Sequence, residues 1–249
     1  MALPGRGRED RGKMGSLLTV KDLVVRFGER TILDGLSFEL VSGEVLAVIG
    51  PNGCGKTVLL KSLLRLLPSA GTIDWAAGTR IGYVPQKIAP DRGLPLRVRE
   101  ALEAKARLMG LGRAEVDRVA ETAGLGSDVL DAAAGLLSGG QFQKMLIAFA
   151  LLGQPNVLLF DEPTASLDEL SEERVYELLH RLQIEQGMTV VLVSHDLSVV
   201  FRYATEVLCL SRGFTCSGPP QRVLTPAALE ALYGAPPKYY VHHAERTNP

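Results

Sequence analysis

The sequence carries almost no net charge. Among its 249 residues, 27 are Lys or Arg and 28 are Asp or Glu, so the formal net charge is −1. Domains that bind nucleic acid are usually basic, with Lys and Arg gathered on one face. The charge balance therefore predicts a protein without a nucleic-acid partner.

Long hydrophobic runs are missing as well. The longest uninterrupted apolar run covers residues 145–152, whereas a membrane-spanning helix needs about 18 or more apolar residues. Residues 1–16 are rich in Gly and Arg and lack an apolar segment, so we expect a disordered leader and no secretory signal. Because 46% of the residues are hydrophobic, a sizeable core is available, and we expect a soluble cytoplasmic protein.

Cysteine is scarce. The chain has three, Cys54, Cys209 and Cys216, and no two of them form a C-x-x-C pair. This number and spacing predict neither a disulfide framework nor a zinc site, and they indicate a reducing compartment.

The N-terminal part has the composition of strands. Three such segments follow one another at residues 17–27, 31–40 and 45–49, with turn signals at Gly28 and at residues 42–43. The third segment, VLAVI, is continuously apolar, as expected for a strand buried on both faces of a sheet. A Gly-rich turn follows, and then apolar spacing that predicts a helix over residues 58–67, stopped by Pro68.

The composition changes between about residues 90 and 137, where Ala, Leu, Arg and Glu dominate. This predicts an inserted helical unit. Beyond it, helices and buried strands alternate, which favours a doubly wound sheet with right-handed crossovers. Residues 235–249 are Pro-rich and then polar, so we expect a loose tail. The predicted elements are helix 140–152, strand 156–160, helix 169–186, strand 189–193, helix 197–204 and strand 207–210.

Residues 50–57, GPNGCGKT, match the pattern G-x-x-x-x-G-K-[ST] between a buried strand and a helix. The glycines let backbone N–H groups converge on phosphate, and the following helix directs the positive end of its dipole there. Lys56 supplies a mobile charge to the β- and γ-phosphates, and Thr57 offers its hydroxyl to Mg²⁺. The alternative is a chance Gly-rich turn, which the flanking elements disfavour.

Two carboxylates, Asp161 and Glu162, end the buried strand predicted before them. Taken alone, they could begin a solvated loop or cap a helix. Together with the phosphate loop they favour another interpretation, in which Asp161 is a partner of Mg²⁺ and Glu162 is the general base for an attacking water.

The segment LSGGQ at residues 137–141 completes a set of motifs that resembles the ATP-binding subunits of ABC transporters. The motifs follow that family's order: the phosphate loop, Gln86 in YVPQ, LSGGQ, DEPT at 161–164, ASLD at 165–168 and SHD at 194–196. The resemblance covers residues 17–234. It implies an α/β fold with a RecA-like P-loop NTPase core, an N-terminal antiparallel β subdomain, a helical subdomain inserted at about residues 90–150, and ATP and Mg²⁺ as cofactors.

The signature segment adds a mechanistic expectation. Ser138, Gly139 and Gly140 open a helix and so form a second N-terminus suited to an anion. The helical insertion carries this end away from Lys56, so one chain holds half of two phosphate sites. We therefore expect a head-to-tail homodimer that binds each ATP between Lys56 of one protomer and Ser138 of the other.

The resemblance also assigns roles to single residues. It implies that Phe27 stacks on adenine, that His195 contacts the γ-phosphate, that Gln86 senses Mg²⁺ or water, and that Asp168 lies at the dimer seam. Taken alone, Phe27 reads as an edge-strand core residue and His195 as a polar loop residue. The expected catalytic residues are Glu162, His195 and Gln86; the Mg²⁺ residues are Thr57, Gln86 and Asp161; the nucleotide-binding residues are Phe27, Gly50, Pro51, Asn52, Gly53, Cys54, Gly55, Lys56, Thr57, Val58, Ser138, Gly139, Gly140, Gln141 and Asp168.

Three features depart from the family pattern or stay open. Lys144 stands where an Arg is more usual, which keeps the charge but loses the planar fork. Cys54 is either a small filler or a thiol whose pKa the helix N-terminus lowers. The insertion is short for this family, so the resemblance does not fix where a partner docks. We expect the docking surface at residues 88–98, with Leu94 and Leu96 exposed.

Residues 141–154 and 209–219 look like the subgroup that serves zinc and manganese importers. This likeness implies integral membrane permease subunits, an extracytoplasmic solute-binding protein, and a position on the cytoplasmic face of the membrane. Transport of another solute stays an alternative. A soluble ABC ATPase would normally carry two phosphate loops or a long coiled coil, and an inert clamp would lack Glu162 or Lys56. The pair at residues 242–243 is either a metal-sensing His pair or two solvated side chains.

Overall fold

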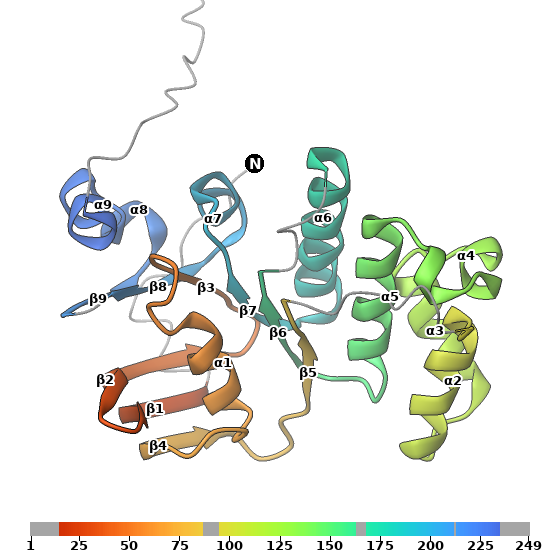
Figure 1. Ribbon diagram of the computed structural model, residues 1–249, viewed down its shortest axis with the longest axis horizontal. Helices are drawn as coiled ribbons and strands as arrows, with labels where there is room; N and C mark the ends of the chain where they lie inside the picture. The colour runs from red at the N-terminus through yellow and green to blue at the C-terminus, as the bar shows by residue number, and fades with distance from the viewer. Residues whose placement is uncertain (1–14, 87–94, 163–167, 212, 235–249) are drawn as a thin grey trace, which may run out of the picture.

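The computed structural model describes residues 15–86, 95–162, 168–211 and 213–234. Two sheets form its centre (Figure 1). The smaller is antiparallel, with the strand order β2-β1-β4, and consists of β1 (Ser16–Phe27), β2 (Arg30–Val41) and β4 (Ala70–Trp75). The expected leader at 1–16 is too long, because Ser16 already belongs to β1. Residues 1–14 and the expected tail at 235–249, including residues 242–243, lie outside the described residues.

The larger sheet has the order β5-β6-β7-β3-β8-β9. Its strand pairs are parallel except for β8 and β9, which are antiparallel. Because consecutive strands of the chain are not neighbours in this order, helices cross over between them, as predicted for a doubly wound fold. The strands are β3 (Val45–Ile49), β5 (Ile81–Val84), β6 (Val157–Asp161), β7 (Thr189–Val193), β8 (Glu206–Ser211) and β9 (Phe214–Gly218).

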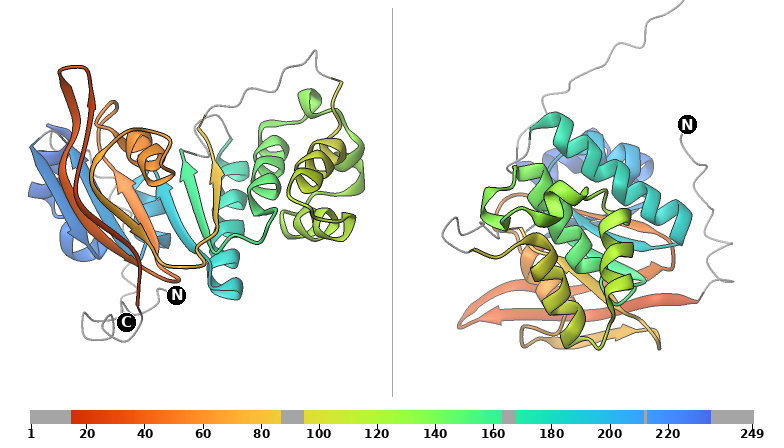
Figure 2. Two further views of the ribbon diagram at one scale, coloured as in Figure 1. Left: turned by 90° about the horizontal axis from the view of Figure 1, so that it is seen from below. Right: turned by 90° about the vertical axis from the view of Figure 1, so that its right-hand side faces the viewer.

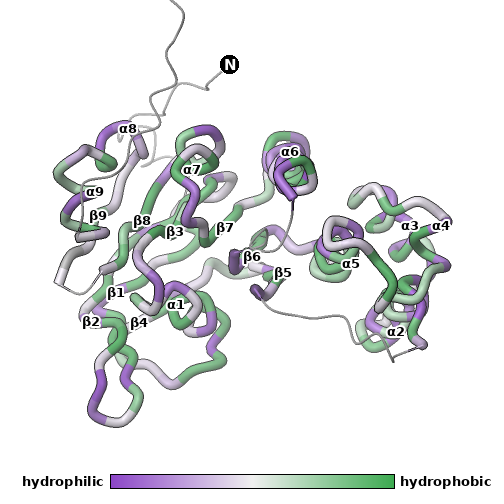
Figure 3. Tube along the Cα trace, turned by 45° about the horizontal axis from the view of Figure 1, so that its top comes forward, coloured by the Kyte–Doolittle hydropathy of each residue, from purple (hydrophilic) through white to green (hydrophobic). Residues whose placement is uncertain are grey.

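Alternate residues of the central strands face two different cores. Val157 and Leu159 of β6 pack with helix α1 (Lys56–Leu63) and the small sheet, whereas Leu158 and Phe160 pack with the helices on the other face. All five residues of β3, β6 and β7 are buried, and Figure 3 shows the central strands largely in the hydrophobic colour. The continuous apolar runs in the sequence therefore reflect burial on both faces.

A group of helices extends the fold beyond β5 (Figure 2). It contains α2 (Val98–Leu108), α3 (Arg113–Thr122), α4 (Ser127–Asp131) and the short 3-10 helix Ala134–Leu136. Helix α5 (Gly139–Leu151) connects this group to the sheet, since it packs against α2 and α3 as well as α6 and β5.

The remaining described helices are α6 (Glu169–Gln186), α7 (Leu197–Tyr203), α8 (Pro220–Val223) and α9 (Pro226–Tyr233). Helix α6 packs against β7, α8 and α9 pack against β8, and α7 contacts both α6 and α8. Within the described ranges, no helix combines the length and the apolar character that crossing a membrane requires.

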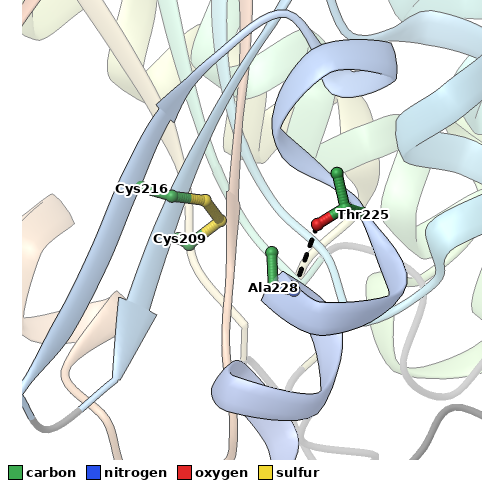
Figure 4. The surroundings of a disulfide bond; sticks show 4 residues. All are labelled: Cys209, Cys216, Thr225 and Ala228. Carbon is green, nitrogen blue, oxygen red and sulfur yellow. Dashed lines mark hydrogen bonds between the residues drawn. A yellow bond between two sulfur atoms is a disulfide. The ribbon is translucent and has the colours of Figure 1, made fainter.

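The predicted fold class is confirmed, but the structure differs from the sequence-based expectations at two places. The helix expected at 58–67 ends at Leu63, before Pro68, because Arg65 adopts a left-handed φ of 57°. No disulfide framework was expected, yet Cys209 of β8 and Cys216 of β9 face each other in the antiparallel ladder and are joined by a disulfide (Figure 4). Strand β9 was not predicted from the sequence, so this pairing could not be foreseen.

Candidate functional site: a phosphate loop beside a buried carboxylate

The phosphate loop has a backbone that only glycine can adopt at two positions. Gly50 has a φ of 151°, and a Cβ there would lie 2.0 Å from the carbonyl oxygen of Leu210. Gly55, which caps α1, has a φ of 113°, and a Cβ there would lie 3.0 Å from the side chains of both Ile32 and Leu33. The loop is therefore pressed against β8 and β2, and α1 begins at Lys56 with its N-terminus turned to the loop.

Lys56 lies at the centre of the loop. Only 6% of its side chain is exposed, and its ammonium donates hydrogen bonds to the carbonyl oxygens of Gly50, at 2.9 Å, and Pro51, at 3.3 Å. Its Nζ atom also lies 3.6 Å from Oε1 of Glu162. The buried cation thus sits between the loop and the end of β6, where an anionic phosphate would be attracted.

Thr57 and Asp161 meet at the same place. The Thr57 hydroxyl donates a 3.0 Å hydrogen bond to Oδ1 of Asp161, a residue that is 1% exposed. Burial raises the pKa of Asp161, and the hydrogen bond from Thr57 partly offsets that rise. A buried carboxylate and a hydroxyl are hard oxygen ligands of the kind Mg²⁺ takes, so these two residues fit that ion.

Tyr83 is a member of the site that sequence reasoning missed. It lies on β5 opposite Leu159 of β6, so its side chain shares a face with Asp161 two residues on. Burial first, and the nearby Asp161 second, raise the pKa of Tyr83 to about 12, and its hydroxyl hydrogen-bonds to that carboxylate. Tyr83 is the Tyr of YVPQ in the sequence, but only the β5–β6 register shows that it lies on the same face as Asp161.

Gln86 and Glu162 are in direct contact. The side-chain amide of Gln86 donates a hydrogen bond to Oε2 of Glu162, whose side chain is 14% exposed. Glu162 has a φ of 47°, a left-handed conformation that is uncommon outside glycine. Such strain is found mainly where the surrounding structure holds a functional group in place.

His195 and Phe27 are both exposed. His195 follows β7, the strand between β6 and β3, and so lies at the same end of the sheet as Asp161 and the loop. Phe27 ends β1 and has half of its side-chain surface open to solvent. The alternative interpretation of Phe27, as a core residue of an edge strand, is therefore wrong.

The signature segment starts a helix as expected but lies apart from the loop. The backbone N–H of Gln141 donates to the Ser138 hydroxyl at 3.3 Å, and the Ser138 N–H donates to Oε1 of Gln141 at 3.0 Å, which forms a capping box. Helix α1 packs against β6 and β2, whereas α5 packs against α2, α3, α6 and β5. Figures 1 and 2 show α1 and α5 on opposite sides of β5 and β6.

Asp168 caps α6 by accepting a 2.9 Å hydrogen bond from the Ser171 N–H. It is exposed, and hydrogen bonds from the Ser171 hydroxyl and backbone lower its pKa. The preceding residues 163–167, which carry most of the DEPT and ASLD motifs, lie outside the described residues.

Two further expectations were corrected or limited. Burial raises the pKa of the Cys54 thiol more than Lys56 lowers it, so the small-filler interpretation is favoured over the low-pKa thiol. In the predicted docking segment, Val98 is fully buried and Leu96 is half-buried, while residues 87–94, including Leu94, lie outside the described part. Among the described residues, no three His, Cys, Asp or Glu side chains gather as a metal site would require.

The geometry defines a P-loop NTPase: a buried strand, a glycine-rich loop, a helix that begins at a buried lysine, and a carboxylate at the tip of a nearby parallel strand. Comparison with known proteins narrows this class. The sequence model of the family described as "ABC transporter" matches residues 33–165. The chain belongs to this family, as an ATP-binding subunit that hydrolyses ATP.

Individual relatives agree with the family assignment. The chain is 39% identical to the zinc import ATP-binding protein ZnuC of Chromohalobacter salexigens, with 94% of this chain and 98% of that protein covered. It is 38% identical to the protein of the same name from Photorhabdus laumondii, over 89% and 85% of the two chains.

Solved structures show the same fold. A metal-chelate type ABC transporter in an inward-facing conformation matches with a TM-score of 0.81 and 29% identity over 90% of both chains. The protein cbiO1 of Clostridium perfringens, part of the cbiONQ transporter complex, matches with a TM-score of 0.74 and 28% identity over 87% of this chain and 93% of that one.

Proposed function

We propose that this chain energises the import of zinc, or of the related ion manganese, as the ATPase subunit of a transporter at the cytoplasmic face of the membrane. This chain covers 98% and 85% of two relatives that are named for zinc import. The observation that carries the ATPase part is the convergence of Lys56, Thr57 and Asp161 at one buried point.

The proposed site holds ATP with Mg²⁺. Lys56 and the loop amides bind the phosphates, and Thr57 and Asp161 hold Mg²⁺, which neutralises charge on the phosphates when bound. Glu162 orients and deprotonates the attacking water, and its contact with Gln86 keeps the carboxylate aimed at the site. His195 stands at the same sheet edge and reaches the γ-phosphate, while the exposed ring of Phe27 stacks on adenine.

The partners follow from the incomplete site. Ser138, Gly139, Gly140 and Gln141 are distant from the loop of their own chain, so a second copy supplies them in a head-to-tail homodimer, with Asp168 near the seam. Closure of the dimer on ATP then changes its shape, and permease subunits convert that change into transport. An extracytoplasmic solute-binding protein delivers the metal to the permease.

Metal uptake in the source cells tests this function. Cells without the chain should lose high-affinity uptake of zinc or manganese and regain it with the wild type but not with Glu162→Gln. Iron uptake measured in parallel tests specificity. Unchanged uptake of all three ions would rule out the proposed substrate, while ATP hydrolysis by the purified chain would still be expected.

A further inference from the structure

The last described helix, α9, packs on the strand that leads into the phosphate loop. Its buried residues Leu229 and Leu232 belong to one apolar cluster with Ala47 and Ile49 of β3 and with Cys209 of β8. Ile49 directly precedes Gly50. Figure 4 shows the first turn of α9, where the Ala228 N–H donates to the Thr225 hydroxyl, beside the Cys209–Cys216 pair.

The side of the phosphate loop that faces β8, here called the rear of the loop, is closely packed. A Cβ on Gly50 would lie 2.0 Å from the Leu210 carbonyl oxygen and 2.9 Å from Sγ of Cys54. Gly50, the first residue of the loop, thus lies between β8 and the Cys54 side chain, and it has little room to move toward β8.

Tyr233, the final residue of α9, reaches this same point. Its hydroxyl interacts with the Gly50 backbone through a hydrogen bond and lies near the Cys54 thiol. Tyr233 is 38% exposed, so it is partly open to solvent while it contacts the start of the loop. Burial raises the pKa of Tyr233.

We propose that Tyr233 is a positioning residue for nucleotide binding, which holds Gly50 and covers Cys54 from behind while the front of the loop takes the phosphates. Two contacts carry the inference: the packing of α9 on β3 and β8, and the meeting of Tyr233, Gly50 and Cys54 at the start of the loop. A loop that is held in its binding shape loses less conformational entropy when phosphate binds.

The test compares Tyr233→Ala and Tyr233→Phe with a matched control, Phe201→Ala, which removes an aromatic ring of similar exposure from α7. Tyr233→Ala should raise the Kd for ATP about threefold to tenfold, the range that corresponds to one net hydrogen bond, and change kcat less than about twofold. Tyr233→Phe removes the same hydrogen bond but keeps the ring, and it should give a similar rise in the Kd for ATP. The control should bind ATP as the wild type does.

Cys54 provides a second readout beside the start of the loop, and the Phe201→Ala control reports the effect of a general loss of stability on it. Cys54 is the one free cysteine of the chain, and its alkylation rate can be followed on its own peptide by mass spectrometry. Tyr233→Ala should speed alkylation several-fold, and ATP should still slow it; Tyr233→Phe and Phe201→Ala should leave the rate near that of the wild type.

Unchanged ATP affinity and unchanged Cys54 alkylation in Tyr233→Ala would overturn the proposal. Equal losses of kcat and of affinity in Tyr233→Ala and in the control would do the same. The inference rests on residues 50–57 being the phosphate loop, and Lys56→Ala tests that assignment separately: if it leaves ATP binding intact, the loop assignment fails, whatever Tyr233 does.

Discussion

The Thr57 hydroxyl lies 3.0 Å from Oδ1 of Asp161, although the two residues are 104 positions apart in the chain. Thr57 is the second residue of α1 and Asp161 ends β6, so this hydrogen bond connects the phosphate loop to the carboxylate edge of the sheet. Asp161 is almost fully buried there, and a buried carboxylate needs partners. Thr57 and Tyr83 provide these partners through hydrogen bonds.

Lys56→Ala should weaken ATP binding itself. The ammonium is buried beside the loop carbonyls and is the one charge at the centre of the loop. Because a charged hydrogen-bond partner is lost, we expect a rise in the Kd for ATP on the order of 10- to 100-fold, measured by calorimetry. Lys21→Ala, an exposed lysine on β1, is the matched control. Similar affinities for both variants would contradict the role of Lys56.

Glu162→Gln should separate binding from hydrolysis. The substitution keeps the size of the side chain but removes the base, so turnover should fall on the order of 100-fold or more while ATP still binds. Light scattering should then show a stable dimer in the presence of ATP. Glu121→Gln, on the exposed face of α3, should hydrolyse ATP normally. A Glu162→Gln variant with wild-type turnover would show that another group activates the water.

Tyr83→Phe should weaken the Mg²⁺ site without unfolding the chain. The phenol hydroxyl hydrogen-bonds to Asp161, so its loss leaves the carboxylate with fewer groups to orient it. We expect the apparent affinity for Mg²⁺ to fall several-fold, by the scale of a single hydrogen bond. Mn²⁺ binding followed by paramagnetic resonance gives a readout independent of ATP hydrolysis. Equal Mn²⁺ affinities would show that Thr57 alone is sufficient.

The pair Glu115–Arg118 should make the helical insertion sensitive to acid. Arg118 donates two hydrogen bonds to the Glu115 carboxylate, at 2.7 and 2.9 Å, and they lower its pKa. A lowered folded-state pKa stabilises the fold at pH above the unfolded value of about 4.3, and this contribution is lost as the pH falls through the folded-state pKa.

Glu115→Gln should therefore cost about 1 kcal/mol at pH 7, or roughly 2–4 °C in Tm, and less at pH 3. Thermal unfolding at the two pH values measures this difference. Glu121→Gln on the same helix is the control and should change Tm little at either pH. A loss of stability that does not depend on pH would point to packing as the cause.

The central strands were predicted well from the sequence because each has a recognisable apolar pattern within its own residues. β3 and β7 were predicted with their observed bounds, because a short, continuously apolar run bounded by turns indicates a buried strand. The bounds of α6 were predicted from its length and the spacing of its apolar residues. The phosphate loop and Asp161 were found because the motif depends on residues that are adjacent in the chain.

The rest depends on contacts between distant residues, which a single sequence does not contain. The strands β4, β5 and β9 lack the continuous apolar run that marked β3 and β7, and β4 is largely exposed. The contacts of Tyr83 with Asp161 and of Tyr233 with Gly50 follow only once the strand order is known. The Cys209–Cys216 pair was missed for the same reason, because it needs the β8–β9 register.

Crosslinking between two variants that each carry one free cysteine tests most directly whether a second copy completes the ATP site. Asn52→Cys on the exposed loop and Leu136→Cys beside the signature helix are each made in a background of Cys54→Ser and Glu162→Gln, which traps bound ATP. When the two variants are mixed and treated with a short bifunctional thiol reagent, we expect a dimer band that requires ATP and Mg²⁺. A nucleotide-trapped dimer without this crosslink, or a crosslink that forms within one chain carrying both cysteines, would contradict the shared site.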